Sequence, residues 1–264
     1  MKPLDDLRPL ILSQIISYPR KLFGHDQSLF KKANCVVTDI METVSAMLLE
    51  EDVVGRNGEN FIWKYTSEYN ADNERTYGNV TSANWFRRTE KDIHNQWGKD
   101  VNLLGLSIAC DKTHVVRLGG ISVHPCYVTI LNLDGCIRRT AKGSEIIGYC
   151  PILPYSNEEF KKVLREQCTV RRDLDDVVKM VKFYLEQSFL NQILAPIMKI
   201  RKEGPITLAV GSKIGKFIPE IMAYVCKYFT HYSKLNYICT CFRISQNLYC
   251  CTRVRDKAPA TIGG

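Results

Sequence analysis

The chain has 264 residues, of which 45% are hydrophobic and 24% are charged, and its formal net charge at pH 7 is +8. These values are ordinary for a soluble globular protein, and no low-complexity tract is visible. No apolar run approaches the roughly 20 residues that a membrane-spanning helix needs, so we expect no membrane association.

Residues 1–53 are predicted to form an N-terminal helical region. Two amphipathic patterns at helical spacing, separated by Pro19 and Gly24, support this prediction. Their apolar positions are Leu10, Ile11, Ile15 and Ile16 in the first pattern, and Val36, Val37, Ile40, Val44, Met47 and Leu48 in the second. The region is a small helical domain or an arm that packs on the core.

Residues 54–100 are predicted to be an irregular, aromatic-rich connecting segment, because glycine and asparagine recur throughout it. Its aromatic residues are interleaved with Arg75, Arg87 and Arg88. Aromatic side chains beside arginines can stack on bases and hold phosphates. They can equally anchor an irregular segment onto a core, and the sequence leaves both interpretations open.

Residues 101–255 are predicted to form an α/β core. Three short apolar runs, Leu103–Cys110, Pro125–Leu133 and Glu145–Leu153, are rich in strand-forming residues and bounded by breakers, which predicts three strands. Asp111 directly follows the first. An acidic residue at the end of a strand is held by rigid backbone, which suits a metal ligand or a general base.

A helix–strand–helix–strand series is predicted after these three strands. Its elements are a long helical region at 157–202, a strand at Ile206–Val210, a helix from Lys216 to about Thr230, and a strand at Leu235–Phe242. We expect Pro196 to kink or end the long helix. Three meandering strands followed by alternating helices and strands are the order of a ribonuclease-H-like mixed sheet. Residues 256–264 form a tail.

The C-terminal quarter is basic. From Arg201 onward the sequence has ten Lys/Arg and three Asp/Glu. Such a segment favours a polyanionic partner, with nucleic acid first, or forms a solvated surface that keeps the protein soluble. The N-terminus lacks the pattern of a signal peptide, so we expect the eleven cysteines to stay reduced in the nucleus or cytoplasm.

Several short motifs occur in the order known from one family. They are Glu74-Arg75-Thr76-Tyr77-Gly78, Asn84-Trp85-Phe86, Pro125 with Tyr127 and Thr129, Ile137-Arg138-Arg139, Gly148-Tyr149-Cys150-Pro151, Phe217-Ile218-Pro219 and Ala223-Tyr224-Val225. Over residues 60–255 the chain resembles the Plavaka group of fungal CACTA-like DNA transposases, as a degenerate or truncated member.

This resemblance implies a DDE-type active site, in which carboxylates from separate elements hold two divalent ions, Mg²⁺ or Mn²⁺. The first carboxylate is then Asp111, as a catalytic metal ligand. Counting back from Pro219 puts Gly211 at the second position. Glycine has no ligating side chain, and Lys213 and Lys216 bring positive charge there.

A third carboxylate at a matching position is absent, because neither Glu203 nor Glu220 falls on the motif. The family's Cys-x-x-Cys pair is replaced by Cys239-Thr240-Cys241 and Cys250-Cys251, whose spacings are poor for tetrahedral zinc. We therefore expect no metal cofactor in this chain.

The sequence thus predicts a transposon-derived protein, the remnant of a DDE-type transposase with impaired catalysis and DNA as its partner. Arg138, Arg139, Lys213 and Lys216 are predicted to contact phosphates, because they are expected in connections and not in strands. The alternatives are a non-catalytic nucleic-acid-binding or protein-interaction module from the same source, and an inert fragment.

Overall fold

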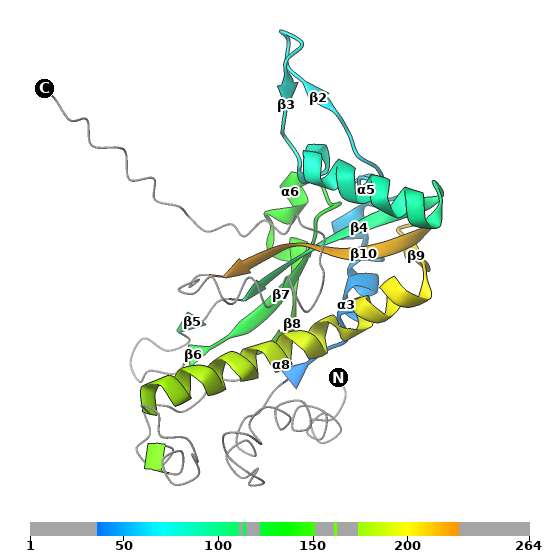
Figure 1. The fold of residues 1–264 in the computed structure, drawn as a ribbon. Helices are drawn as coiled ribbons and strands as arrows, with labels where there is room; N and C mark the ends of the chain where they lie inside the picture. Colours follow the sequence, from blue (N-terminus) through cyan, green and yellow to red (C-terminus); the bar gives the residue numbers. More distant parts are fainter. Residues whose placement is uncertain (1–35, 111–112, 115–121, 151–160, 163–173, 227–264) are drawn as a thin grey trace, which may run out of the picture.

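A mixed sheet of five longer strands and one two-residue strand forms the centre of the protein. The computed structural model describes residues 36–110, 113–114, 122–150, 161–162 and 174–226 (Figure 1). In spatial order the strands are β1 (Val36–Val37), β8 (Ser144–Tyr149), β7 (Pro125–Ile130), β4 (Val101–Cys110), β10 (Lys213–Cys226) and β9 (Ile206–Val210). The α/β class predicted from the sequence is confirmed.

The three predicted strands between residues 103 and 153 are confirmed as an antiparallel meander. β4 pairs with β7, which places Leu106 opposite Ile130 and Cys110 opposite Cys126. β7 pairs in turn with β8, with an irregularity in register after Cys126. Val, Ile and Leu dominate these strands, and such side chains pack well on a pleated, buried surface.

Strand β10 shows that the helix predicted from Lys216 was wrong. It runs parallel to β4, from Lys216 opposite Val101 to Cys226 opposite Cys110. Its first residues form a hairpin with β9, the strand predicted at 206–210. The predicted strand at 235–242 lies outside the described residues.

The apolar residues of β10 explain the error. They come in adjacent pairs four residues apart, which fits a helical stripe. In the structure the members of each pair lie in different clusters, because Phe217 and Ile221 belong to one core cluster and Ile218 and Met222 to the other. A strand covered on both faces loses its alternation of apolar and polar residues.

Helices cover both faces of the sheet. Helix α5 (Asn84–Trp97) lies on one face, and α3 (Ile40–Met47) and α8 (Leu174–Glu203) lie on the other (Figure 1). Pro196 does not end α8, which continues to Glu203. Among the described residues, no helix combines the length and the apolar character needed to cross a membrane.

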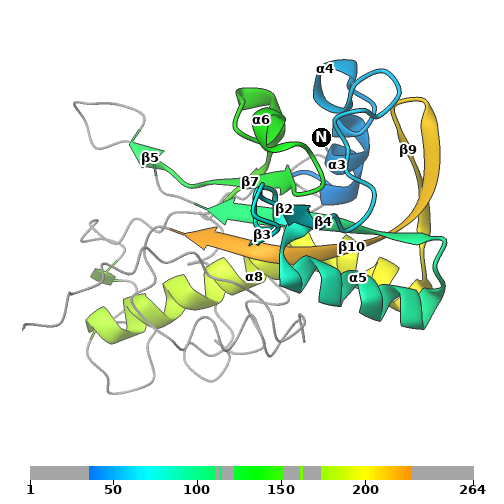
Figure 2. The same cartoon turned by 90° about the horizontal axis from the view of Figure 1, so that it is seen from above.

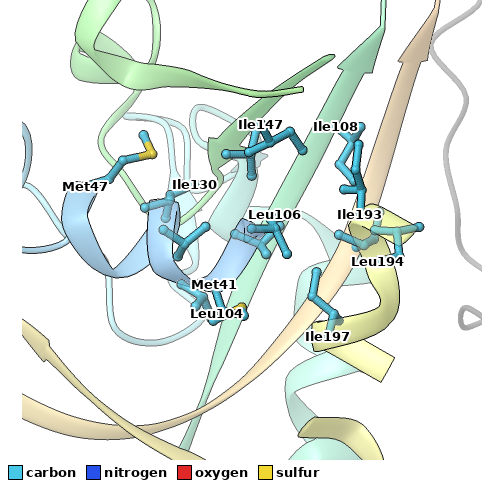
Figure 3. Packing of buried hydrophobic residues seen from close by; sticks show 14 of the residues in the cluster. Met41, Met47, Leu104, Leu106, Ile108, Ile130, Ile147, Ile193, Leu194 and Ile197 are labelled. Atoms are coloured by element: carbon cyan, nitrogen blue, oxygen red, sulfur yellow. The ribbon is translucent and has the colours of Figure 1, made fainter. Parts of the chain in front are cut away.

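The larger core cluster joins α3, the sheet and α8. Figure 3 shows side chains from these three sources in one layer: Met41, Met47, Leu104, Leu106, Ile108, Ile130, Ile147, Ile193, Leu194 and Ile197. Each fully buried aliphatic side chain contributes on the order of 1.5–3 kcal/mol relative to exposure. The smaller cluster, around Phe86 and Leu103, holds α5 against the opposite face.

Part of the predicted N-terminal helical region is confirmed as α3. Asp39 caps this helix, because its carboxylate accepts hydrogen bonds from the backbone N–H groups of Met41 (2.7 Å) and Glu42 (3.2 Å). Strand β1 takes the place of a helix at Val36–Val37, and residues 1–35 lie outside the described part of the chain.

The segment 54–100 is more ordered than predicted. It follows the short helix α4 (Glu51–Val54) and contains helix α5 and a two-stranded arm of β2 (Glu68–Tyr69) and β3 (Arg75–Thr76) that projects from the body (Figure 1). Ala83 stands at the N-cap of α5 and offers no side-chain cap. The sequence therefore lacks the usual signal for the start of this helix.

Buried Asn132 fixes the loops at the N-terminal end of β4. Its amide nitrogen donates to the carbonyl oxygens of Ile62 (2.9 Å) and Leu103 (3.0 Å), and its carbonyl oxygen accepts from Gly105 N–H (2.8 Å). The short helix α6 (Gly135–Arg138) follows directly, and Figure 2 shows it beside α4. Asn132 thus ties the chain before α6 to β4 by two hydrogen bonds and to the loop at Ile62 by a third.

Candidate metal centre and nucleic-acid interface

The predicted metal ligand Asp111 lies outside the described residues, but the strand that precedes it is well defined. β4 ends at Cys110. On the two neighbouring strands the residues opposite Cys110 are Cys126 of β7 and Cys226 of β10. Register therefore places cysteines, and not acids, on both strands beside the end of β4.

Cys110 and Cys126 form a buried thiol pair. The Cys110 thiol donates to the sulfur of Cys126, 2.8 Å away, and both residues are buried in the larger core cluster. Contact with Cys110 and burial both raise the pKa of the Cys126 thiol, and the nearby Cys150 adds to this effect. A thiol held in its protonated form is a poor metal ligand, because metals bind the thiolate.

The described residues do not supply a cluster for a metal ion. Within residues 36–110, 113–114, 122–150, 161–162 and 174–226, no group of three or more His, Cys, Asp or Glu side chains is arranged to hold one. Hard divalent ions such as Mg²⁺ prefer several oxygen ligands. The side chains described beside the end of β4 are thiols, which do not fit that preference.

The position inferred for the second carboxylate, Gly211, lies at the wrong end of the sheet. Gly211 and Ser212 form the turn between β9 and β10, close to the N-terminal end of β4. β4 has ten residues, so its two ends lie about 30 Å apart. A side chain at position 211 would therefore lie far from Cys110, the residue that ends β4.

Gly211 has a structural reason to be glycine. Its φ is +56°, and a Cβ at this position would lie 2.7 Å from the Arg56 carbonyl oxygen and 2.8 Å from that of Gly55. The turn is held there because Gly211 N–H donates to Leu48 O (2.9 Å) and Ser212 N–H donates to Arg56 O (3.1 Å).

The two other acids considered for the metal site also lie elsewhere. Glu220 is buried within β10, opposite Gly105 of β4, and its carboxylate accepts from Arg201 Nε at 3.0 Å. Burial raises its pKa to about 7, although the Arg201 charge acts in the opposite direction. Glu203 is exposed at the end of α8 beside Lys199.

Arg138, one of the four predicted phosphate contacts, is a structural clamp. Its Nε donates to Leu133 O (2.9 Å) and its Nη2 to Asn79 Oδ1 (2.7 Å), which joins α6 to the segment before α5. Burial lowers the pKa of its guanidinium. Arg139 is exposed, and its Nε donates to Gly135 O at 3.0 Å, which leaves its terminal nitrogens on the surface.

Lys213 and Lys216 lie within strand β10, so the expectation that they belong to a connection was wrong. Lys216 forms an exposed ion pair with Asp100, with 2.9 Å between Nζ and Oδ2. Lys213 is the first residue of the strand and is exposed. A nucleic-acid phosphate would compete with Asp100 for Lys216, whereas Lys213 stands at the surface of the turn.

The predicted basic residues gather at one end of the sheet. α6 and the turn that follows it reach α4 through the ion pair of Lys142 with Asp52, and the β9–β10 turn contacts Arg56 in the loop after α4. The structure therefore brings Arg138, Arg139 and Lys213 to the N-terminal end of β4. Asp111 follows the other end.

The family profile described as Plavaka transposase matches residues 7–232, which is most of the chain. The chain belongs to the Plavaka transposase family. No curated protein and no solved structure matches it. Membership in the Plavaka family makes this a transposase-derived protein, suggests DNA as its partner, and implies a divalent metal ion in the ancestral enzyme.

One cluster of Plavaka motif residues was left undecided by the sequence and is well defined in the structure. Arg75 and Tyr77, from the motif at residues 74–78, lie at the base of the β2–β3 arm, where the Arg75 guanidinium stacks on the Tyr77 ring at 4.8 Å. In the sequence, the signal for this site was the alternation of aromatic residues with arginines. Only the fold shows which of these aromatic side chains are exposed.

Proposed function

We propose that this chain is a transposase-derived protein that binds DNA and whose metal-dependent cleavage centre is incomplete. The ancestral reaction is cleavage and transfer of DNA strands by a DDE-type enzyme, with Asp111 as the remaining metal ligand. Its site of action is the nucleus, where its DNA substrate is found. Family membership supports the ancestry and DNA as the partner, and the order of the strands supports the type of core.

The order of the strands supports a ribonuclease-H-like core. β4, β7 and β8 form an antiparallel meander, and β10 lies beside β4 and parallel to it. In such a core the first strand has a later strand as its parallel neighbour; here that neighbour is β10, and β9, which precedes it, lies at the edge of the sheet, antiparallel to β10. In this chain the described ends of the two strands are Cys110 and Cys226, which lie opposite each other, and Asp111 and Lys227 follow them in the sequence.

The sequence after β10 carries the proposal. Residues 227–255 contain five Lys/Arg and no Asp/Glu. The sequence that follows β10 therefore carries positive charge and offers no second carboxylate of the kind that metal-dependent catalysis would need. Positive charge repels a divalent cation and attracts a phosphate backbone.

Binding to DNA is tested with the full chain and a labelled duplex by fluorescence anisotropy at several salt concentrations. We expect affinity to fall steeply with salt, because each phosphate contact releases counterions. Asp111→Asn should leave the affinity unchanged. Absence of binding at low salt would refute the proposal and favour the protein-interaction alternative.

Cleavage is tested with supercoiled plasmid and Mg²⁺ or Mn²⁺. We expect little or no nicking by the wild-type chain. Robust nicking that Asp111→Asn abolishes would contradict the incomplete centre. Glu145→Gln is the matched control, because Glu145 is an exposed acid on β8, and nicking that survives both substitutions points to a contaminating nuclease.

A further inference from the structure

The base of the β2–β3 arm presents a prearranged aromatic surface. Tyr77 is 60% exposed, although the guanidinium of Arg75 lies over its ring at 4.8 Å. Arg75 itself is fixed by hydrogen bonds to Tyr65 Oη (2.7 Å), Ser82 O (3.0 Å) and Asn84 Oδ1 (2.6 Å). One face of the Tyr77 ring is thus held by a rigid arginine, while much of the side chain stays accessible.

Three exposed cations lie next to this surface on helix α5. Arg87, Arg88 and Lys91 are exposed, whereas Phe86 and Ile93 of the same helix are buried against the sheet. The Arg87 guanidinium also lies over the Tyr65 ring at 5.6 Å. The outer face of α5, which also carries the exposed Asp92, therefore has more cations than acids and begins where the arm leaves the body (Figure 1).

Acidic residues on the arm limit the direction in which a polyanion can cross this surface. Glu68 is engaged by the backbone, because its carboxylate accepts from Gly78 N–H (3.0 Å) and Asn79 N–H (3.3 Å). Asp72 and Glu74 are exposed at the turn of the arm. A polyanion is repelled by the turn and attracted by α5, so its path would run from Tyr77 across the helix.

We infer that the arm base is a binding site for unpaired DNA, in which a base stacks on Tyr77 and the flanking phosphates contact Arg87, Arg88 and Lys91. This inference rests on the proposed DNA-binding function and names the part of the surface that holds a single strand. Stacking needs the open face of a base, which a duplex buries. A ring already held by Arg75 loses little freedom on binding.

The test uses the full chain and labelled oligothymidine in an anisotropy titration. Tyr77→Ala should weaken binding about 5- to 100-fold, the range for loss of one stacked base. Tyr77→Phe keeps the ring and should bind as the wild type does. Tyr69→Ala is the matched control, because Tyr69 is 59% exposed on the same arm, and it should have little effect.

The phosphate contacts are tested by salt dependence. Arg87→Gln should reduce the slope of log K against log salt by about 0.7, the value for one contact with a single strand. Equal losses for Tyr69→Ala and Tyr77→Ala, or tighter binding of oligouridine than of oligothymidine, would overturn the inference. Circular dichroism and thermal melting of each variant show whether it is folded.

The two proposals fail in different ways. If the wild type binds duplex DNA but Tyr77→Ala binds oligothymidine unchanged, the arm base is not the site and the proposed function stands. If the wild type binds neither duplex nor single strand at low salt, both fail. Retained binding by Tyr77→Phe together with loss in Tyr77→Ala supports stacking, because the two variants differ only in the ring.

Discussion

The buried carboxyl group of Glu220 should make the protein less stable as the pH rises. Only 7% of its side chain is accessible, and Arg201 Nε lies 3.0 Å from its Oε1. Burial raises its pKa from 4.5 to about 7 in spite of the arginine. The cost of removing the carboxylate from water therefore exceeds the gain from this one partner.

The direction and the magnitude of this change in stability follow from proton linkage. An acid with a raised pKa in the folded state binds more protons there than in the unfolded chain, so stability is lost as the pH rises from 4.5 to about 7. The difference between these two pKa values corresponds to about 3 kcal/mol. For a chain of this size, that is a shift in Tm of roughly 6–12 °C.

The assay is thermal unfolding of the wild type, Glu220→Gln and Glu203→Gln at pH values from 5 to 8. Glu220→Gln should gain stability relative to the wild type as the pH rises, approaching about 3 kcal/mol at pH 8. Glu203→Gln is the control, because the Glu203 side chain is 65% exposed, and it should follow the wild type. If the difference in stability between the wild type and Glu220→Gln does not change with pH, the reasoning is refuted.

Three further substitutions test how the N-terminal end of β4 is held, each by the free energy of unfolding in urea. Asn132→Ala leaves three backbone groups without a partner and should cost about 3 kcal/mol; a cost below 1 kcal/mol contradicts this role. Arg138→Ala should cost about 1–3 kcal/mol because two hydrogen bonds are lost, whereas the exposed neighbour change Arg139→Ala should cost at most about 0.5 kcal/mol; equal costs would disprove the clamp. Gly211→Ala forces a Cβ to within 2.7 Å of a carbonyl oxygen at positive φ and should cost more than about 2 kcal/mol, so a neutral result would show that the turn rearranges.

Short apolar runs with clear boundaries were enough to predict most of the sheet. β4, β7, β8 and β9 were predicted within a few residues, because strand-forming side chains between breakers leave little choice of structure. Helix α8 was predicted as well, although Pro196 does not end it. Tertiary packing overrides the local cost of a proline when the helix on either side is held against a core.

Strand β10 and helix α5 were not predicted, because the local sequence of each lacks the pattern that usually marks such an element. In β10 both faces are buried, so the apolar residues of the strand follow no period of two. In α5 the N-cap is Ala83, so no capping side chain marks the start. The two errors differ in origin: the partner that fixes β10, strand β4, is distant in sequence, whereas α5 directly precedes β4 and lacks only a capping signal.

The candidate site depended on pairing that no local motif contains. Counting back from Pro219 by the spacing of the family motif assigned a ligand position to Gly211, at the end of the strand predicted at 206–210. The parallel register of β10 moves the relevant strand end from Val210 to Cys226. The residue types indicated which side chains could bind a metal ion. Which of these side chains lie close together is decided by the order and direction of the strands.

The structure also separates the predicted phosphate contacts from the end of β4 that precedes the predicted metal ligand. Arg139 and Lys213 lie at the N-terminal end of β4, and Asp111 follows its C-terminal end about 30 Å away. Phe86 lies against Gly105 in the middle of β4, so the arm base lies between the two ends. One phosphodiester cannot contact both ends, and a duplex that reaches from one to the other must be at least about nine base pairs long. Contacts at the two ends therefore act independently, and the effects of substitutions on DNA affinity should add.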